Sequence, residues 1–249
     1  MRRFPQHLLL ISPRRRSDFL SGCLLGALGS FFFFAVSRTD AQPVTGSIRG
    51  TILLPETNEF MEELLRERSL TRYEMHLHGS NEPVEPYRPS ETAVVYLEAV
   101  PAPAGGYDPP AAHPQLNQSQ MLFRPLVLPV LVGSTVDFPN NDNLFHNVFS
   151  YSQPREFDLG RYPRGQLRSV RFDRTGVVNV YCDIHSYMYA TILVLENPYY
   201  AVPDEDGSYT IENVPAGSYK LVFWYGRKKV SAKSVTVEEK KTTVVNLGF

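Results

Sequence analysis

The sequence predicts an all-β protein made of short strands that pack as sandwiches. Apolar and polar residues alternate over many short segments, which is the period of a half-buried strand. Turn residues interrupt these segments at short intervals, since the 249-residue chain contains 20 prolines and 16 glycines. Beyond the N-terminal apolar stretch, helical spacing of apolar residues is confined to one segment after the first strand. Strands of this length and spacing are typical of a β-sandwich.

Two strands are expected in the first part of this β region. Residues 47–54 form an alternating segment that ends at Pro55, and residues 92–100 form an apolar segment that ends at Pro101. Proline has no backbone N–H to donate, so it terminates strand pairing. We therefore assign residues 44–100 to the first part of one β-sandwich.

A helical insertion and a linker interrupt the strands. Residues 57–69 are expected to be helical because Thr57 can act as the N-cap and Phe60 and Leu64 share one face. Residues 101–115 contain five prolines and a Gly-Gly pair, which is the composition of a linker. A domain boundary is therefore expected in this linker.

Residues 116–197 are expected to form a second β domain. Its segments with a strand pattern are residues 121–132, 135–138, 168–172, 177–181 and 189–195. The first two segments are expected to pair across a glycine turn, and the last is expected to return antiparallel to the one before it.

Residues 198–249 are expected to complete the first sandwich. Strand patterns occur at residues 208–211, 218–225 and 230–247, the last with a turn near Glu239-Lys240. The halves of one sandwich would then flank the second β domain in the sequence.

Four side chains with metal-binding chemistry lie near predicted strand ends. Cys182, His185 and Met188 fall within seven residues directly after a strand, and His146 lies upstream. One thiolate, two imidazoles and one thioether are the donors of a blue-copper electron-transfer site. One tight loop can supply three donors while the fourth comes from another strand end, so that the metal is held rigidly.

Each of these residues also has a simpler interpretation. Cys182 alone could be a small buried hydrophobic residue, His185 a loop residue and Met188 part of the core. Structural zinc would need four Cys or His donors, and a cysteine hydrolase would need a base oriented by a third group. The spacing of all four donors together favours copper.

The surroundings of the donors resemble the cupredoxin family. Phe172 and Gly176 precede Cys182 by the length of one strand, and residues 138–142, Phe-Pro-Asn-Asn-Asp, precede His146-Asn147 by a short loop. The two-residue gap before Met188 is most similar to amicyanin and plastocyanin-like blue copper proteins. The resemblance covers residues 116–197 and implies a Greek-key β-sandwich that holds one type 1 copper.

Residue roles follow from this resemblance. It implies that His146, Cys182 and His185 are equatorial copper ligands and that Met188 is the axial ligand. It also implies that Asn147 ties the two ligand loops together by hydrogen bonds.

A wider resemblance covers the flanking segments. Residues 46–51 and 93–97, together with 206–219, resemble the carboxypeptidase regulatory-like (prealbumin-like) β-sandwich. This arrangement is similar to exported cupredoxin-like proteins often labelled methylamine utilisation proteins. The chain departs from them at Ser186, where many relatives have proline, and in the long insertion at residues 58–79.

Residues 1–41 are expected to be an export signal peptide. Arg14-Arg15-Arg16 precedes an uncharged stretch at residues 19–36, and Thr39 and Ala41 place small residues before a cleavage site. The arginines also resemble a twin-arginine signal, so the Sec and twin-arginine routes both stay open. The stretch is long enough to span a bilayer if it is not cleaved, so a retained anchor is the alternative.

Composition excludes some classes of partner. Residues 1–41 hold six of the 25 Lys+Arg and two of the 26 Asp+Glu, which leaves 19 against 24 and a formal charge of −5. Nucleic-acid-binding domains are basic instead. The remaining chain keeps one cysteine, Cys182, and can form no internal disulfide.

We therefore expect a periplasmic or otherwise extracytoplasmic protein with one type 1 copper. It would be a monomer without a membrane span after signal cleavage, would not be an enzyme, and would pass single electrons to and from a cytochrome or dehydrogenase. Electrons would cross at the edge of His185, through an apolar patch that includes Ile184 and Tyr187. Two alternatives are a noncatalytic glycan- or protein-binding module, in which copper is structural or absent, and a protein that delivers copper.

Overall fold

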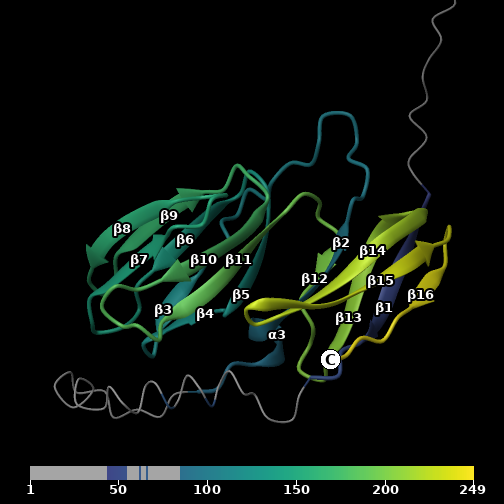
Figure 1. The fold of residues 1–249 in the computed structure, drawn as a ribbon. Helices are drawn as coiled ribbons and strands as arrows, with labels where there is room; N and C mark the ends of the chain where they lie inside the picture. Colours follow the sequence, from purple (N-terminus) through teal and green to yellow (C-terminus); the bar gives the residue numbers. More distant parts are fainter. Residues whose placement is uncertain (1–43, 55–61, 63–65, 67–84) are drawn as a thin grey trace, which may run out of the picture. The chain divides into compact units, whose positions relative to one another are not determined.

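The structure, a computed structural model, describes residues 44–54, 62, 66 and 85–249 (Figure 1). The described residues are almost entirely strands and turns, so the all-β prediction is confirmed. The predicted signal peptide and most of the helix predicted at residues 57–69 lie outside the described residues; Glu62 and Arg66 in that segment are helical and exposed. Among the residues that the structure describes, no helix has the length and apolar character needed to cross a membrane.

The central part of the sequence forms a five-stranded sheet and two strand pairs. The five strands, in their order across the sheet, are β5 (Val127–Leu131), β11 (Tyr189–Leu195), β10 (Gly176–Tyr181), β7 (His146–Ser150) and β8 (Phe157–Tyr162). The pairs are β3 (Asn117–Ser119) with β4 (Leu122–Arg124), and β6 (Thr135–Pro139) with β9 (Leu167–Arg171). Only the β5–β11 pairing is parallel among these.

Two details of the strand prediction are wrong. The segment 121–132, expected as one strand, is divided into β4 and β5 around Pro125, because proline cannot donate a ladder hydrogen bond. The strands β5 and β6, expected to pair with each other, belong to different sheets and pair with β11 and β9. Pro129 is tolerated within β5 because β5 is an edge strand.

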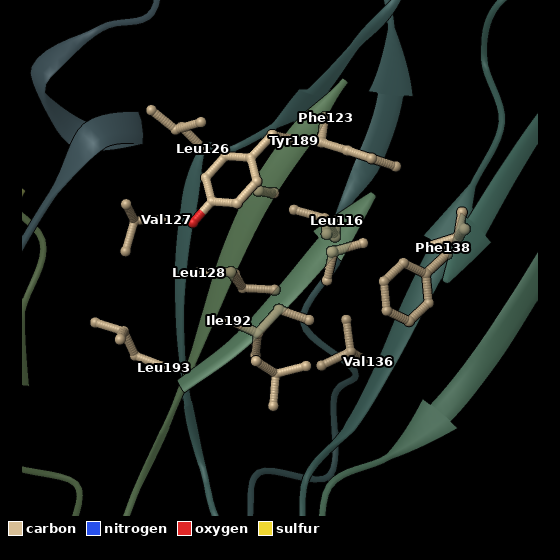
Figure 2. Close-up of a cluster of buried hydrophobic side chains, with 14 of the residues drawn as sticks. Leu116, Phe123, Leu126, Val127, Leu128, Val136, Phe138, Tyr189, Ile192 and Leu193 are labelled. Carbon is tan, nitrogen blue, oxygen red and sulfur yellow. The ribbon is translucent and has the colours of Figure 1, made fainter. Parts of the chain in front are cut away.

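These strands enclose a first hydrophobic core. Alternate residues of β6, Val136 and Phe138, are fully buried, and every residue of β11 is buried. Figure 2 shows Val136, Phe138 and Ile192 within this cluster, with Leu116 and Leu128 beside them. The strand β11, which follows the predicted ligand loop, is therefore packed among apolar side chains.

The two ends of the described sequence form a second group of sheets. A four-stranded sheet has the order β12 (Tyr200–Ala201), β2 (Ala93–Glu98), β14 (Gly217–Tyr225) and β15 (Lys228–Val237). A three-stranded sheet has the order β13 (Ser208–Pro215), β1 (Thr45–Thr51) and β16 (Thr242–Val244). The short helix α3 (Pro89–Thr92) leads into β2. Figure 1 shows the early strands β1 and β2 beside the late strands that pair with them.

The strand β2 contributes to both hydrophobic cores. Val94 belongs to the first core, with Trp224 of β14. Ala93, Val95 and Phe223 belong to a second core, which also contains buried residues of β1, β13 and β15. Both faces of this sheet are thus covered by apolar side chains. This explains why the sequence of β2 is continuously apolar instead of alternating.

Candidate metal centre

Neighbouring strands bring the predicted metal ligands together. His146 is the first residue of β7, and Cys182 directly follows β10, which pairs antiparallel with β7 through Tyr181 and Phe149. His185 lies in the loop from β10 to β11. The sheet therefore places the upstream histidine beside a loop that begins 36 residues later in the sequence, at Cys182.

The donor atoms of three predicted ligands converge. Nδ1 of His146 lies 3.0 Å from Nδ1 of His185, and Sγ of Cys182 lies 3.8 Å from that same atom. All three donor atoms lie within 4.8 Å of one another. Donors bonded to one metal at about 2.0–2.3 Å would lie about 3–4 Å apart. The observed spacing and the N, N, S donor set fit a single transition-metal ion.

The donors are shielded from solvent. His146 is fully buried, and Cys182 and His185 are only 5% and 4% exposed. Among the described residues, Cys182 is a free thiol. The three donor side chains are therefore largely screened from bulk water.

The site favours the thiolate form of Cys182. Burial raises the pKa of the thiol, but hydrogen bonds from His146 and His185 and the backbone N–H groups of Asn147 and His185 outweigh burial and lower that pKa to about 6. Thiolate is the form that binds metals. The sulfur is therefore prepared for a metal by groups of the protein itself.

Asp142 contacts the buried histidine from the side opposite the donor cluster. Nε2 of His146 donates a hydrogen bond to Oδ2 of Asp142 at 2.8 Å. Burial lowers the pKa of His146, but this carboxylate and the Cys182 sulfur outweigh it and raise that pKa. The sequence did not lead us to predict this role for Asp142. The available signal was its position, four residues before the predicted ligand His146.

Asn147 connects three strands around the site. Its backbone N–H reaches the sulfur of Cys182. Its side-chain Nδ2 donates to Oδ1 of Asp158 on β8 at 2.7 Å. The contact of Asn147 with the second ligand loop is thus made by its main chain, while its side chain braces β7 against β8.

Met188 closes the ligand loop. Its backbone N–H donates to the carbonyl oxygen of His185 at 3.0 Å, and its side chain is fully buried. The loop also carries Asp183, whose carboxylate pairs with Arg161 of β8 at 2.9 Å. That pair is exposed on both sides and contributes little stability.

The expected electron-transfer patch is wrong in one residue. Tyr187 is only 1% exposed, because its ring packs in the first core beside His185. Ile184 is partly buried. Two aromatic residues next to predicted ligands do reach solvent: Phe145 directly precedes His146 and is 57% exposed, and Tyr181 directly precedes Cys182 and is 36% exposed.

Comparisons with known proteins give partial matches. Residues 195–245 match the family model described as polysaccharide lyase family 4, domain II. No curated protein matches the sequence. A Cu(I) structure of an amicyanin variant is 20% identical, covers 41% of this chain and 98% of its own, and has a TM-score of 0.32.

Two further solved structures are similar over parts of the chain. A purple cupredoxin from Nitrosopumilus maritimus is 23% identical over 33% of this chain and 99% of its own, with a TM-score of 0.30. A copper-containing nitrite reductase from Thermus scotoductus is 25% identical over 45% of this chain and 28% of its own, with a TM-score of 0.34. These matches cover less than half of the chain at low TM-scores, so the donor cluster is the stronger indication of function. The carboxypeptidase regulatory-like resemblance stays a prediction.

Proposed function

We propose that this protein holds one type 1 copper ion and passes single electrons between partner proteins outside the cytoplasm. The observation that carries the proposal is the buried convergence of the Cys182 sulfur with the Nδ1 atoms of His146 and His185. Met188, on the same loop, would be the axial ligand, and Asn147 would brace the ligand strands.

The protein's own residues suit this role. A bound copper ion would supply a one-electron redox couple. The strands β7 and β10 and the apolar core behind them hold the donors in place, so the ligands need hardly move when the charge of the site changes. Cys182 and His185 are almost fully buried, which leaves little of the site open to a substrate and supports an electron carrier over an enzyme.

The partner would be a redox protein such as a cytochrome or a dehydrogenase. Phe145 offers an exposed aromatic surface directly beside His146, and aromatic residues are enriched at protein interfaces. The export pattern of residues 1–41 supports a periplasmic or other extracytoplasmic location. A monomer would suffice, because one chain supplies all four proposed ligands.

A second candidate is a noncatalytic glycan-binding module. It is favoured by the match of residues 195–245 to domain II of a polysaccharide lyase family. In that case copper would be structural or absent, and binding of oligosaccharides would not depend on the metal.

Visible spectroscopy tests the copper proposal. Cu(II) added to the protein should produce an intense sulfur-to-copper band that disappears on reduction with one electron per protein. Cys182→Ser should abolish the band. His113→Ala should retain it, because His113 is exposed and pairs with Asp137 instead of the cluster. A colourless protein that takes up no copper would contradict the proposal.

Two further measurements separate the alternatives. An electron carrier should retain its ion against a chelator, whereas a copper-delivery protein should exchange it rapidly. A glycan-binding module should bind oligosaccharides equally well before and after Cys182→Ser. Binding of that kind by a protein without the copper band would favour the second candidate.

A further inference from the structure

We propose that Asp142 is a positioning residue that fixes the ring of His146 and tunes the metal bound there. This inference rests on the proposed copper site. Asp142 would not bind the metal itself. It would act through its hydrogen bond to the proposed ligand His146. Asp142 makes four hydrogen bonds, to residues in three parts of the chain, that support this role.

The carboxylate of Asp142 is held by a tight turn from another element. The turn between β3 and β4 consists of Gln120 and Met121, whose φ angles of 56° and 58° place both in the left-handed region. The backbone N–H of Gln120 donates to Oδ1 of Asp142 at 2.6 Å, and that of Met121 donates to Oδ2 at 2.7 Å. Two consecutive non-glycine residues in this region are unfavourable, and here they aim two donors at one carboxylate.

The backbone of Asp142 is held as well. Its N–H donates to Oδ1 of Asn140 at 2.9 Å. The side chain of Asn140 in turn donates to the carbonyl oxygens of Leu144 and Tyr162. The carboxylate therefore has a fixed position before any metal arrives.

A fixed carboxylate at Nε2 determines which nitrogen of His146 faces the cluster. Because Nε2–H donates to Oδ2 of Asp142, Nδ1 points to the sulfur of Cys182 and to His185. A hydrogen bond from a ligand imidazole to a carboxylate also makes the imidazole a stronger donor. Stronger donation stabilises the more highly charged Cu(II) state and so lowers the reduction potential.

The first test compares Asp142→Asn with Asp183→Asn. Both substitutions remove one negative charge, but Asp183 lies beside Cys182 and pairs with Arg161, without a hydrogen bond to an imidazole. We expect Asp142→Asn to weaken copper binding about 10- to 100-fold and to raise the reduction potential above the values of the native protein and of Asp183→Asn. Equal affinities and potentials in the two variants would overturn the proposal.

The second test needs no copper. In the native metal-free protein, the Nε2 proton of His146 should give a downfield, slowly exchanging NMR signal, because it is buried and bonded to a carboxylate. Asp142→Asn should shift this signal upfield and speed its exchange, and Asp183→Asn should leave it in place. An unchanged signal in Asp142→Asn would overturn the positioning role.

The two tests separate this inference from the proposed function. If the native protein binds no copper, the proposed function fails, while the Nε2 signal still decides whether Asp142 positions His146. If copper binds and the signal does not respond to Asp142→Asn, only the positioning role fails. Asp142→Ala, judged by the same signal, provides a second variant if the asparagine variant does not fold.

Discussion

The Nδ1 atoms of His146 and His185 lie 3.0 Å apart, although 39 residues separate them in the sequence. Without a metal ion, two imidazole nitrogens approach so closely when one of them carries a proton and donates it to the other. A bound metal ion would take the place of that proton. It would also link β7 to the loop after β10.

Copper should therefore stabilise the folded protein. With free copper at 100 times its dissociation constant, ligand binding to the native state adds about 2.7 kcal/mol. Calorimetry should show a higher melting temperature after loading, and His146→Ala should remove the increase. The exposed variant His113→Ala is the control and should keep it. An unchanged melting temperature in the loaded native protein would contradict the site.

The thiol of Cys182 should ionise near pH 6 in the metal-free protein, because hydrogen bonds from two imidazoles and two backbone N–H groups lower its pKa to about 6. Since the folded-state pKa is lowered, the thiolate's contribution to stability is complete above the ordinary thiol pKa of about 8.5 and is lost as the pH falls through about 6.

The ultraviolet absorbance of the thiolate measures this ionisation. It is obtained at each pH as the difference between the native protein and Cys182→Ser. A midpoint near the ordinary thiol value would show that the hydrogen bonds do not form in solution.

Tyr162→Phe should destabilise the first core. The hydroxyl of Tyr162 donates to the carbonyl oxygen of Phe138 at 2.9 Å and accepts from Nε2 of Gln118 at 2.7 Å, and all of these groups are buried. Loss of the hydroxyl leaves buried polar groups without a partner and should cost about 1–3 kcal/mol. Urea unfolding measures this cost. Tyr151→Phe, at a residue 79% exposed, is the matched control and should change stability by less than about 0.5 kcal/mol.

Gly50→Ala should destabilise the three-stranded sheet of β13, β1 and β16. A methyl group at Gly50 would overlap the carbonyl oxygen of Val245. The backbone N–H of Val245 donates to the carbonyl oxygen of Arg49 at 2.9 Å, which holds the two segments together. Relief of this overlap requires a backbone shift between β1 and the segment after β16, with an expected cost of about 1–3 kcal/mol. At Gly248 the nearest atom to an added methyl is 3.7 Å away, so Gly248→Ala is the control. Equal urea midpoints for the two variants would refute the close approach.

The sequence predicted many of the strands because strand patterns are local, although it did not predict β7 (His146–Ser150) or β8 (Phe157–Tyr162). Residues 47–54 and 92–100, for example, correspond to β1 (Thr45–Thr51) and β2 (Ala93–Glu98). Pairing is not local, which is why β5 and β6 were assigned to one pair although they belong to two sheets. The domain boundaries and the four-ligand set stay predictions, although the structure brings Cys182, His146 and His185 together.

Other contacts of the site could not be predicted from the sequence. The carboxylate of Asp142 is held by the backbone N–H groups of Gln120 and Met121, about 20 residues earlier in the sequence. The residues around Asp142 do not indicate this contact. Tyr187 was expected at the surface because it neighbours His185, but its direction depends on how the loop closes over the core. Such contacts depend on tertiary packing, which neither periodicity nor spacing encodes.

The sheet that contains β2 and β14 has apolar side chains of both cores on its two faces. Melting of either core would therefore expose apolar side chains of β2 and β14, such as Val94 and Trp224 on one face or Val95 and Phe223 on the other. Unfolding should then be cooperative across residues 85–249, and local opening in one core should be coupled to the other. A ligand held at Cys182, in the first core, would in this way slow proteolysis of β15, whose buried residues belong to the other core.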